Sequence, residues 1–144
     1  MPYSYSANGL ALTEAYEGCV LTTYDDVVGV PTIGYGHTGP DVTPGLTITQ
    51  QQASDLLMQD VGWAVDCVNE SVTVTINQNQ FDAMVDFTFN VGKNAFENST
   101  LLSLLNAENY AGAAGQFNRW VYAKGQVIPG LVRRRAGETA LFNS

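Results

Sequence analysis

Residues 17–37 read EGCVLTTYDDVVGVPTIGYGH, and this stretch decides the fold class. Glycines and a proline interrupt its short runs of threonine and valine: Gly18, Gly29, Pro31, Gly34 and Gly36. Such punctuation is typical of a small antiparallel sheet with tight turns. We therefore expect a β-rich region over 19–48, while helical patterns dominate the rest of the chain.

Helical patterns flank this stretch on both sides. Upstream, Asn8 is expected to cap a helix that runs to Glu17 and ends at Gly18. Downstream, Thr49 is a good N-cap, and apolar residues recur at helical spacing from 53 to 68. We expect one long helix over 49–70, long enough to bridge two lobes.

The second half of the chain is mostly helical in pattern. Residues 72–76 (VTVTI) alternate like a strand but lead directly into NQNQF, so we interpret them as a linker. Apolar positions at helical spacing follow over 78–91, 99–106, 108–121 and 130–142.

The sequence thus predicts an α+β fold with two lobes in one domain, 1–144. A β-rich lobe (about 19–48) is joined by the connecting helix (49–70) to a helical lobe, 71–144 with 1–18. A cleft between two such lobes is where a ligand site usually forms.

Composition excludes several classes of protein. With 144 residues, 45% of them apolar and 14% charged, the chain is far from the signature of disorder. Two cysteines are too few for a disulfide-stapled miniprotein, and we expect Cys19 and Cys67 to be buried free thiols, with a disulfide formed after export as the alternative. No apolar run is long enough to span a membrane. The N-terminus carries Glu14 and Glu17 where the apolar part of a signal peptide would lie, so we expect synthesis in a cytoplasm without a signal peptide.

Charge is distributed unevenly along the chain. Residues 1–92 contain eleven acids and no Lys or Arg, whereas residues 93–144 contain all six bases against three acids. A nucleic-acid-binding protein needs a basic footprint, and a pI near 4.2 argues against one. For the same reason we expect no binding to anionic membranes in general and no stable membrane insertion.

The string GYGHTG at 34–39 formally matches the G-x-G-x-x-G phosphate-binding fingerprint. That fingerprint needs a strand before it and a helix opening directly after it. Pro40 and Pro44 follow here, so no helix opens, and we interpret the string as a tight turn in the sheet.

Two carboxylates stand out because of their surroundings. Glu17 closes the first expected helix, and Asp26 follows it within the glycine-rich stretch. Glycoside hydrolysis needs one protonated carboxyl, which gives a proton to the leaving oxygen, and one ionised carboxylate, which activates water. In a chain with fourteen acids, however, a pair alone is weak evidence.

The pattern around the pair is far more specific. The string E-G-x-x-L-x-x-Y-x-D-x-x-G-x-x-T-I-G-Y-G-H over 17–37 closely resembles the phage-type lysozymes, the endolysins of glycoside hydrolase family 24. Later blocks resemble the family too: NQF at 79–81, FNVG at 89–92, RW at 119–120 and PGL at 129–131. The resemblance therefore covers nearly the whole chain and implies a lysozyme-like fold.

The resemblance implies roles for three residues. Glu17 would be the general acid, Asp26 would orient or activate the attacking water, and the Thr32 hydroxyl would help to hold that water. We expect hydrolysis without metal or cofactor. We also expect single displacement with inversion, because a threonine-held water between the acid and Asp26 needs room that a direct nucleophile would not need. His37 is the only histidine, which by itself excludes a metal cluster of several histidines.

Further residues receive supporting roles from the same resemblance. His37 should pair with Asp60 on the long helix as an ion pair that tethers the lobes. Thr38, Phe89 and Ser99 fall where the family contacts sugar, although each could equally be a packing residue. One of Arg133 and Arg134 should approach Glu17, and the remaining arginines of that run should be solvated.

The implied substrate is the β-1,4 bond between N-acetylmuramic acid and N-acetylglucosamine in peptidoglycan glycan strands. We expect a monomer that reaches the periplasm or cell wall during phage lysis, with a holin as the export route; a secreted antibacterial toxin or a prophage remnant would use the same chemistry. A lytic transglycosylase, which can manage with a single acid, and a non-catalytic peptidoglycan-binding module are the alternatives. The acidic pI departs from the commonly basic family and leaves the preferred wall type open.

Overall fold

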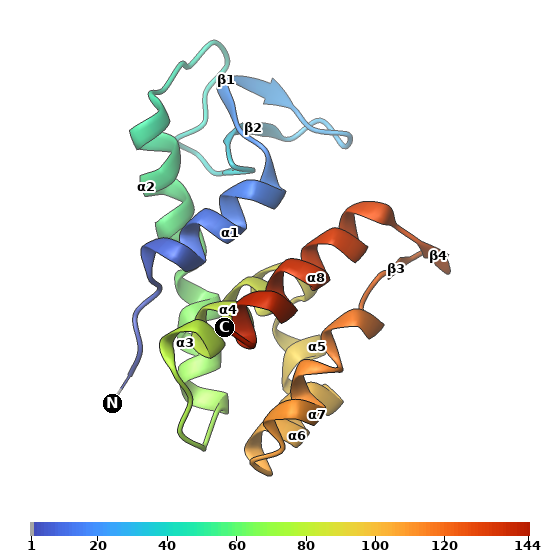
Figure 1. The fold of residues 1–144 in the computed structure, drawn as a ribbon. Helices are drawn as coiled ribbons and strands as arrows, with labels where there is room; N and C mark the ends of the chain where they lie inside the picture. Colours follow the sequence, from blue (N-terminus) through green and yellow to red (C-terminus); the bar gives the residue numbers. More distant parts are fainter. Residues whose placement is uncertain (1) are drawn as a thin grey trace. The chain divides into compact units, whose positions relative to one another are not determined.

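A computed structural model describes residues 2–144 (Figure 1). The chain divides into two compact units. We call Thr13–Gly62 the sheet unit, and the N-terminal residues through Leu12 together with Trp63–Ser144 the helical unit. The division differs from the expected one in two places. Residues 13–18, which we expected in the helical lobe, belong to the sheet unit, and so does the first half of the expected connecting helix.

The expected long helix over 49–70 is two helices. Helix α2 is Gln50–Asp60 and helix α3 is Gly62–Ser71, with a turn at Val61 between them. Thr49 caps α2 as expected: its hydroxyl accepts from the Gln52 backbone N–H at 3.1 Å, and the Gln52 side chain bonds back to the Thr49 N–H. The apolar spacing continues through both helices, so periodicity alone could not reveal the break, whereas the poor helix former Gly62 marks it.

Helix α1 (Ala7–Glu17) begins before the expected cap. Ser6 caps it rather than Asn8, since the Ser6 hydroxyl accepts from the Gly9 backbone N–H at 3.3 Å. The same hydroxyl donates to Asp82, which lies far along the chain, so a tertiary contact favours Ser6. Gly18 ends the helix as expected, with a positive φ of 69° that favours glycine.

The sheet of the sheet unit is a single antiparallel pair, β1 (Val20–Asp25) and β2 (Pro31–Gly34). Tyr24 pairs with Thr32, and the register is irregular between Val20 and Tyr24. Helix α2 packs on β2: a Cβ on Gly34 would lie 3.4 Å from the Ala53 side chain, so glycine permits the close approach. Ile33, Ala53 and Leu57 form the centre of this core and are at most 1% exposed.

The helical unit is organised around α4 (Gln78–Val91), which begins at an Asn77–Gln80 capping box. Residues 81–88 are all buried, as expected for a helix with neighbours on every side. Helix α8 (Pro129–Phe142) makes the most extensive contact with α4. The remaining helices are α5 (Lys93–Glu97), α6 (Thr100–Asn106), α7 (Tyr110–Ala114) and the short 3-10 helix η1 (Phe117–Arg119).

Most of the expected elements of this unit are confirmed. Helix α4 matches 78–91, α8 matches 130–142 within a residue, and residues 72–76 form a linker without helix or strand. The expected helix over 108–121 is wrong, because α7 ends at Ala114 before Gly115 and only η1 follows. A two-stranded hairpin, β3 (Tyr122–Ala123) and β4 (Gln126–Val127), was not foreseen. None of the helices within 2–144 is long and apolar enough to cross a membrane.

Candidate active site

Glu17 is the last residue of α1 in the sheet unit, and its side chain is partly exposed. The helix is fixed near this end, since the Ser54 hydroxyl on α2 donates to the Glu14 carboxylate at 2.9 Å. Gly18 then turns the chain into β1. This local structure presents a carboxyl group at the junction between a helix and a strand.

Asp26 lies in the turn that joins β1 to β2 and is partly exposed. Its carboxylate oxygen Oδ1 accepts hydrogen bonds from the backbone N–H groups of Val28 and Val30, each at 2.9 Å. The Asp26 backbone also pairs with Val30 across the turn at 3.0 Å. The turn therefore holds the carboxylate in one orientation, with one oxygen engaged by backbone donors.

Thr32 lies on β2 and is 4% exposed. Its hydroxyl donates to the Val30 carbonyl at 2.8 Å, so the hydroxyl oxygen can act only as an acceptor toward any further partner. Val30 thus contacts both residues: its N–H binds Asp26 and its carbonyl binds Thr32.

The contact between His37 and Asp60 is present, with His37 Nδ1 2.8 Å from Asp60 Oδ2. Both residues belong to the sheet unit, so the pair connects the GYGH turn to α2 within that unit. The expectation that it tethers one lobe to the other is therefore wrong. Asp41 is a second partner that sequence reasoning missed, at 2.9 Å from His37 Nε2. Burial alone would lower the pKa of His37, but the hydrogen bonds to Asp60 and Asp41 outweigh burial and raise it.

The three expected sugar contacts differ in their surroundings. Thr38 is exposed in the sheet unit, beside His37. Phe89 lies at the C-terminal end of α4 in the helical unit, partly exposed, with its ring 6.2 Å from that of Trp63. Ser99 is the N-cap of α6: its hydroxyl accepts from the Leu102 N–H at 3.1 Å and donates to the Phe96 carbonyl at 2.7 Å. The Ser99 side chain is only 6% exposed, so capping α6 explains why a serine lies at this position.

The run Arg133, Arg134 and Arg135 corrects a further expectation. Arg133 is exposed, and its approach to Glu17 stays a prediction. Arg134 forms a buried pair with Asp86, at 2.8 Å and 3.0 Å. Arg135 is fully buried, with its Nε 2.7 Å from Glu138. The expectation that the other arginines are solvated is therefore wrong, because α8 turns two of them toward acids in the core.

Glu138 completes a buried cluster that sequence reasoning missed. Burial raises its pKa well above the ordinary value, the hydrogen bond with Asp86 raises it further, and Arg135 only partly opposes these effects. A spacing of three residues between Arg135 and Glu138 on a helix was the available signal. Spacing alone, however, gives no indication that both side chains are buried.

The two cysteines lie in different units and in different environments. In the part of the chain that the structure describes, both are free, with Cys67 buried and Cys19 exposed. The expectation that both are buried is thus wrong for Cys19, which follows the turn at Gly18. Burial raises the pKa of the Cys67 thiol.

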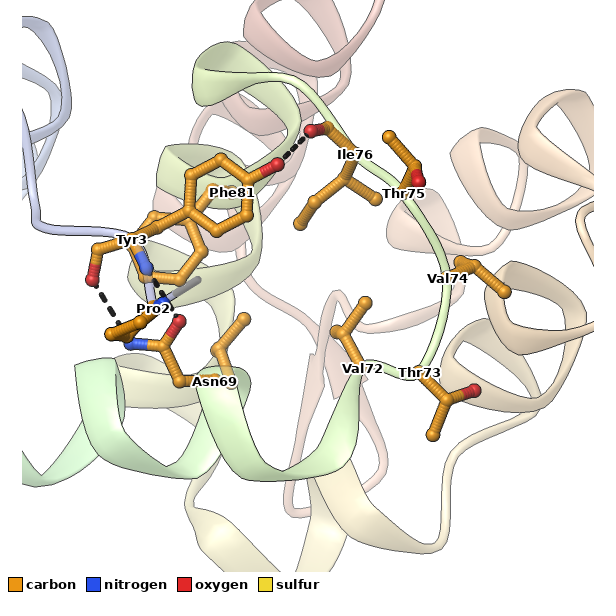
Figure 2. Close-up of a pocket in the computed structure, with 10 residues that line it drawn as sticks. Pro2, Tyr3, Asn69, Val72, Thr73, Val74, Thr75, Ile76 and Phe81 are labelled. Carbon is orange, nitrogen blue, oxygen red and sulfur yellow. Dashed lines mark hydrogen bonds between the residues drawn. The ribbon is translucent and has the colours of Figure 1, made fainter.

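One cavity of the helical unit is lined by none of the candidate residues (Figure 2). Its volume is about 500 Å³, and the 72–76 linker forms one wall. Tyr3 stacks on Phe81 with ring centroids 5.0 Å apart, and its hydroxyl donates to the Ile76 carbonyl. Valines and threonines line most of the remainder, so this cavity offers no acid–base pair.

The fold is of the lysozyme-like α+β class. The family described as Phage lysozyme matches residues 14–138. The chain belongs to this phage lysozyme family.

Individual relatives agree with this assignment. An endolysin of Bacillus phage PZA is 49% identical over 96% of this chain, which spans 55% of that protein's length, about half. A lysozyme variant of phage P22 has a TM-score of 0.92 at 45% identity, covering 99% of both chains. The muramidase domain of SpmX from Asticaccaulis excentricus has a TM-score of 0.90 at 36% identity, also covering 99% of both.

Proposed function

We propose that this chain acts as an endolysin that hydrolyses the β-1,4 bond between N-acetylmuramic acid and N-acetylglucosamine in bacterial peptidoglycan. Membership of the phage lysozyme family supports the endolysin class. The observation that carries the finer assignment is the Asp26 turn, in which one segment orients both a carboxylate and the Thr32 hydroxyl.

Glu17 is the proposed general acid. It gives its proton to the glycosidic oxygen as the bond from that oxygen to the anomeric carbon breaks. A water molecule attacks the anomeric carbon from the opposite face and passes its proton to Asp26. One C–O bond is broken and another is formed, while one proton leaves Glu17 and one reaches Asp26; no metal or cofactor takes part in the proposed steps.

Asp26 and Thr32 are proposed to place that water. The Thr32 hydroxyl already donates its one hydrogen bond to the Val30 carbonyl, so it can only accept a hydrogen bond from water. A water that donates to Thr32 and to Asp26 has its lone pair left for the anomeric carbon. Single displacement with inversion follows, because a separate water between carboxylate and sugar requires more space than a direct nucleophile does.

Thr38 of the sheet unit and Phe89 of the helical unit are each proposed to contact the glycan. The aromatic ring of Phe89 suits the apolar face of a sugar, and Thr38 offers an exposed hydroxyl. The proposed setting is the cell wall during phage lysis, where a monomer acts on glycan strands after a holin has opened the route.

The test compares Glu17→Gln with Glu14→Gln on purified peptidoglycan in H₂¹⁸O. Glu14 lies one turn earlier on α1, and a glutamine there can still accept from Ser54. We expect the wild type and Glu14→Gln to release reducing muramic acid ends that carry ¹⁸O, and Glu17→Gln to release almost none. Anhydro-muramic ends would indicate a transglycosylase. If the wild type and both variants bind peptidoglycan but none of the three releases fragments, the chain is a non-catalytic module. Either result overturns the proposal.

A further inference from the structure

The positive charge of this acidic chain is concentrated in one stretch. Residues 109–137 contain five of the six bases and no acid. Arg134 and Arg135 are buried against acids of the core, whereas Arg119, Lys124 and Arg133 are exposed. The exposed bases thus give the surface of this stretch a positive charge that is absent from the sheet unit, which contains no Lys or Arg.

A second cavity of the helical unit opens within this stretch. Its volume is about 420 Å³, within the range of ligand sites. Three elements supply its polar and aromatic lining. The 3-10 helix η1 and the segment after it contribute Arg119, Trp120 and Tyr122, α4 contributes Asn90, and α8 contributes Arg135. Trp120 is anchored edge-on against Phe87 at 5.4 Å, so one wall is a fixed aromatic surface.

The polar groups of this cavity are arranged as donors. Arg135 Nη2 donates to Asn90 Oδ1 at 2.7 Å, which fixes the orientation of the exposed Asn90 amide. The Asn90 N–H groups are therefore the ones left for a ligand. The buried Arg135 has a further nitrogen, Nη1, without a hydrogen-bond partner in residues 2–144. The exposed Arg119 side chain has no hydrogen bond or ion pair to any other residue of that described part.

We propose that this cavity binds a free carboxylate on the peptide stem of the glycan substrate, and that Arg119 makes cleavage faster when that carboxylate is not amidated. A guanidinium fork and an amide donor match the two oxygens of a carboxylate, and the aromatic wall suits short aliphatic side chains. Asn90, which lines the cavity, directly follows Phe89, the proposed sugar contact, and both lie at the C-terminal end of α4. The inference rests on the proposed function.

A short peptide fits better than a long polyanion or a lipid surface. A polyanion needs a row of cations, and of the exposed bases only Arg119 lines the cavity. Amidation would replace one carboxylate oxygen by an amino group, which cannot accept from Arg119.

The test measures kcat/KM on soluble disaccharide–tripeptide oligomers with free stem carboxylates and on the same oligomers after chemical amidation. We expect the wild type to prefer the free form by about tenfold, the size of a charged hydrogen bond. Arg119→Gln should bring the ratio close to one, mainly by losing activity on the free form. Lys93→Gln removes an exposed base outside the cavity and should keep the wild-type ratio.

Equal cleavage of both forms by the wild type, or an equal loss on both forms in Arg119→Gln, overturns the inference. Binding of the isolated tripeptide and its amide, followed by NMR shifts of the Trp120 indole, tests it without catalysis. If the enzyme binds the free tripeptide in preference but cleaves no oligomer, the proposed function fails and the binding site stands. If inorganic phosphate competes as well as the tripeptide does, the cavity is a general anion site and the peptide assignment fails.

Discussion

The sheet unit and the helical unit contain equal numbers of acids but use them differently. All seven acids of Thr13–Gly62 are at least partly exposed, and this unit has no Lys or Arg to pair with them. The helical unit buries Asp82, Asp86 and Glu138 completely and pairs two of them with buried arginines. A carboxylate that must bind water and exchange protons needs access to solvent, whereas a carboxylate that orients helices needs a fixed partner. The comparison therefore predicts that substituting an acid of the candidate site in the sheet unit lowers activity and leaves stability unchanged. In the helical unit, breaking a buried ion pair should lower stability and leave activity unchanged.

The largest effect is expected on activity in the sheet unit. Asp26→Asn should lower kcat by about 10²–10⁴-fold, the usual contribution of a positioned acid or base. Stability should hardly change, because the asparagine oxygen can still accept from Val28 and Val30. Cleavage assays and thermal melts measure the two effects, and the exposed neighbour Asp25→Asn is the matched control. Retained activity in Asp26→Asn would contradict the role of Asp26.

The reverse pattern is expected in the helical unit. Arg134→Met leaves the buried Asp86 carboxylate unpaired, which should cost about 3–5 kcal/mol of unfolding free energy. Denaturant melts measure this, and activity per folded molecule should be retained. The double variant Asp86→Leu with Arg134→Met should recover much of the loss, since it removes both charges. A cost below about 1 kcal/mol for Arg134→Met would mean that water reaches the pair.

A smaller effect on stability is expected where the start of α1 packs against α4. A Cβ on Gly9 would lie 2.4 Å from the Tyr5 ring and 2.8 Å from the Asp82 carboxyl carbon. Gly9→Ala should therefore destabilise by about 1–3 kcal/mol despite the better helix propensity of alanine. Gly62→Ala at the start of α3 meets no neighbour within 4 Å and should be neutral or stabilising. Equal melting temperatures of the two variants would argue against close packing at Gly9.

The smallest effect concerns pH and lies in the sheet unit. His37 has a raised pKa in the folded protein, so its contribution to stability is fully present below the unfolded value of about 6.5. That contribution is lost as the pH rises through the folded pKa. The melting temperature of the wild type, relative to His37→Asn, should fall by a few degrees between about pH 6 and pH 8. A constant difference across this range would mean that folding does not raise the pKa of His37. Asp41→Asn should weaken the dependence, because it removes one of the two hydrogen-bond partners that raise the pKa.

The local pattern of the sequence predicted the elements whose signals are complete within a few residues. Thr49 marks a helix start, Gly18 marks a helix end, and the pattern of 78–91 marks a helix that the structure confirms residue for residue. The prediction of a helix over 108–121 was wrong because small and apolar residues there satisfy a helical period, although α7 ends at Ala114, before Gly115.

The sequence by itself determined the family, the α+β class and the stretch that contains Glu17, Asp26 and Thr32, because these depend on residue types at fixed short spacings. Only the tertiary structure decided which charges are buried. Helix α8 carries three consecutive arginines with different surroundings. Arg133 is exposed, whereas Arg134 pairs with Asp86 and Arg135 pairs with Glu138 in the core. It likewise decided that Ser6 caps α1 and that Asp41 joins His37. Burial and pairing depend on segments far apart in the chain, so no local pattern contains them.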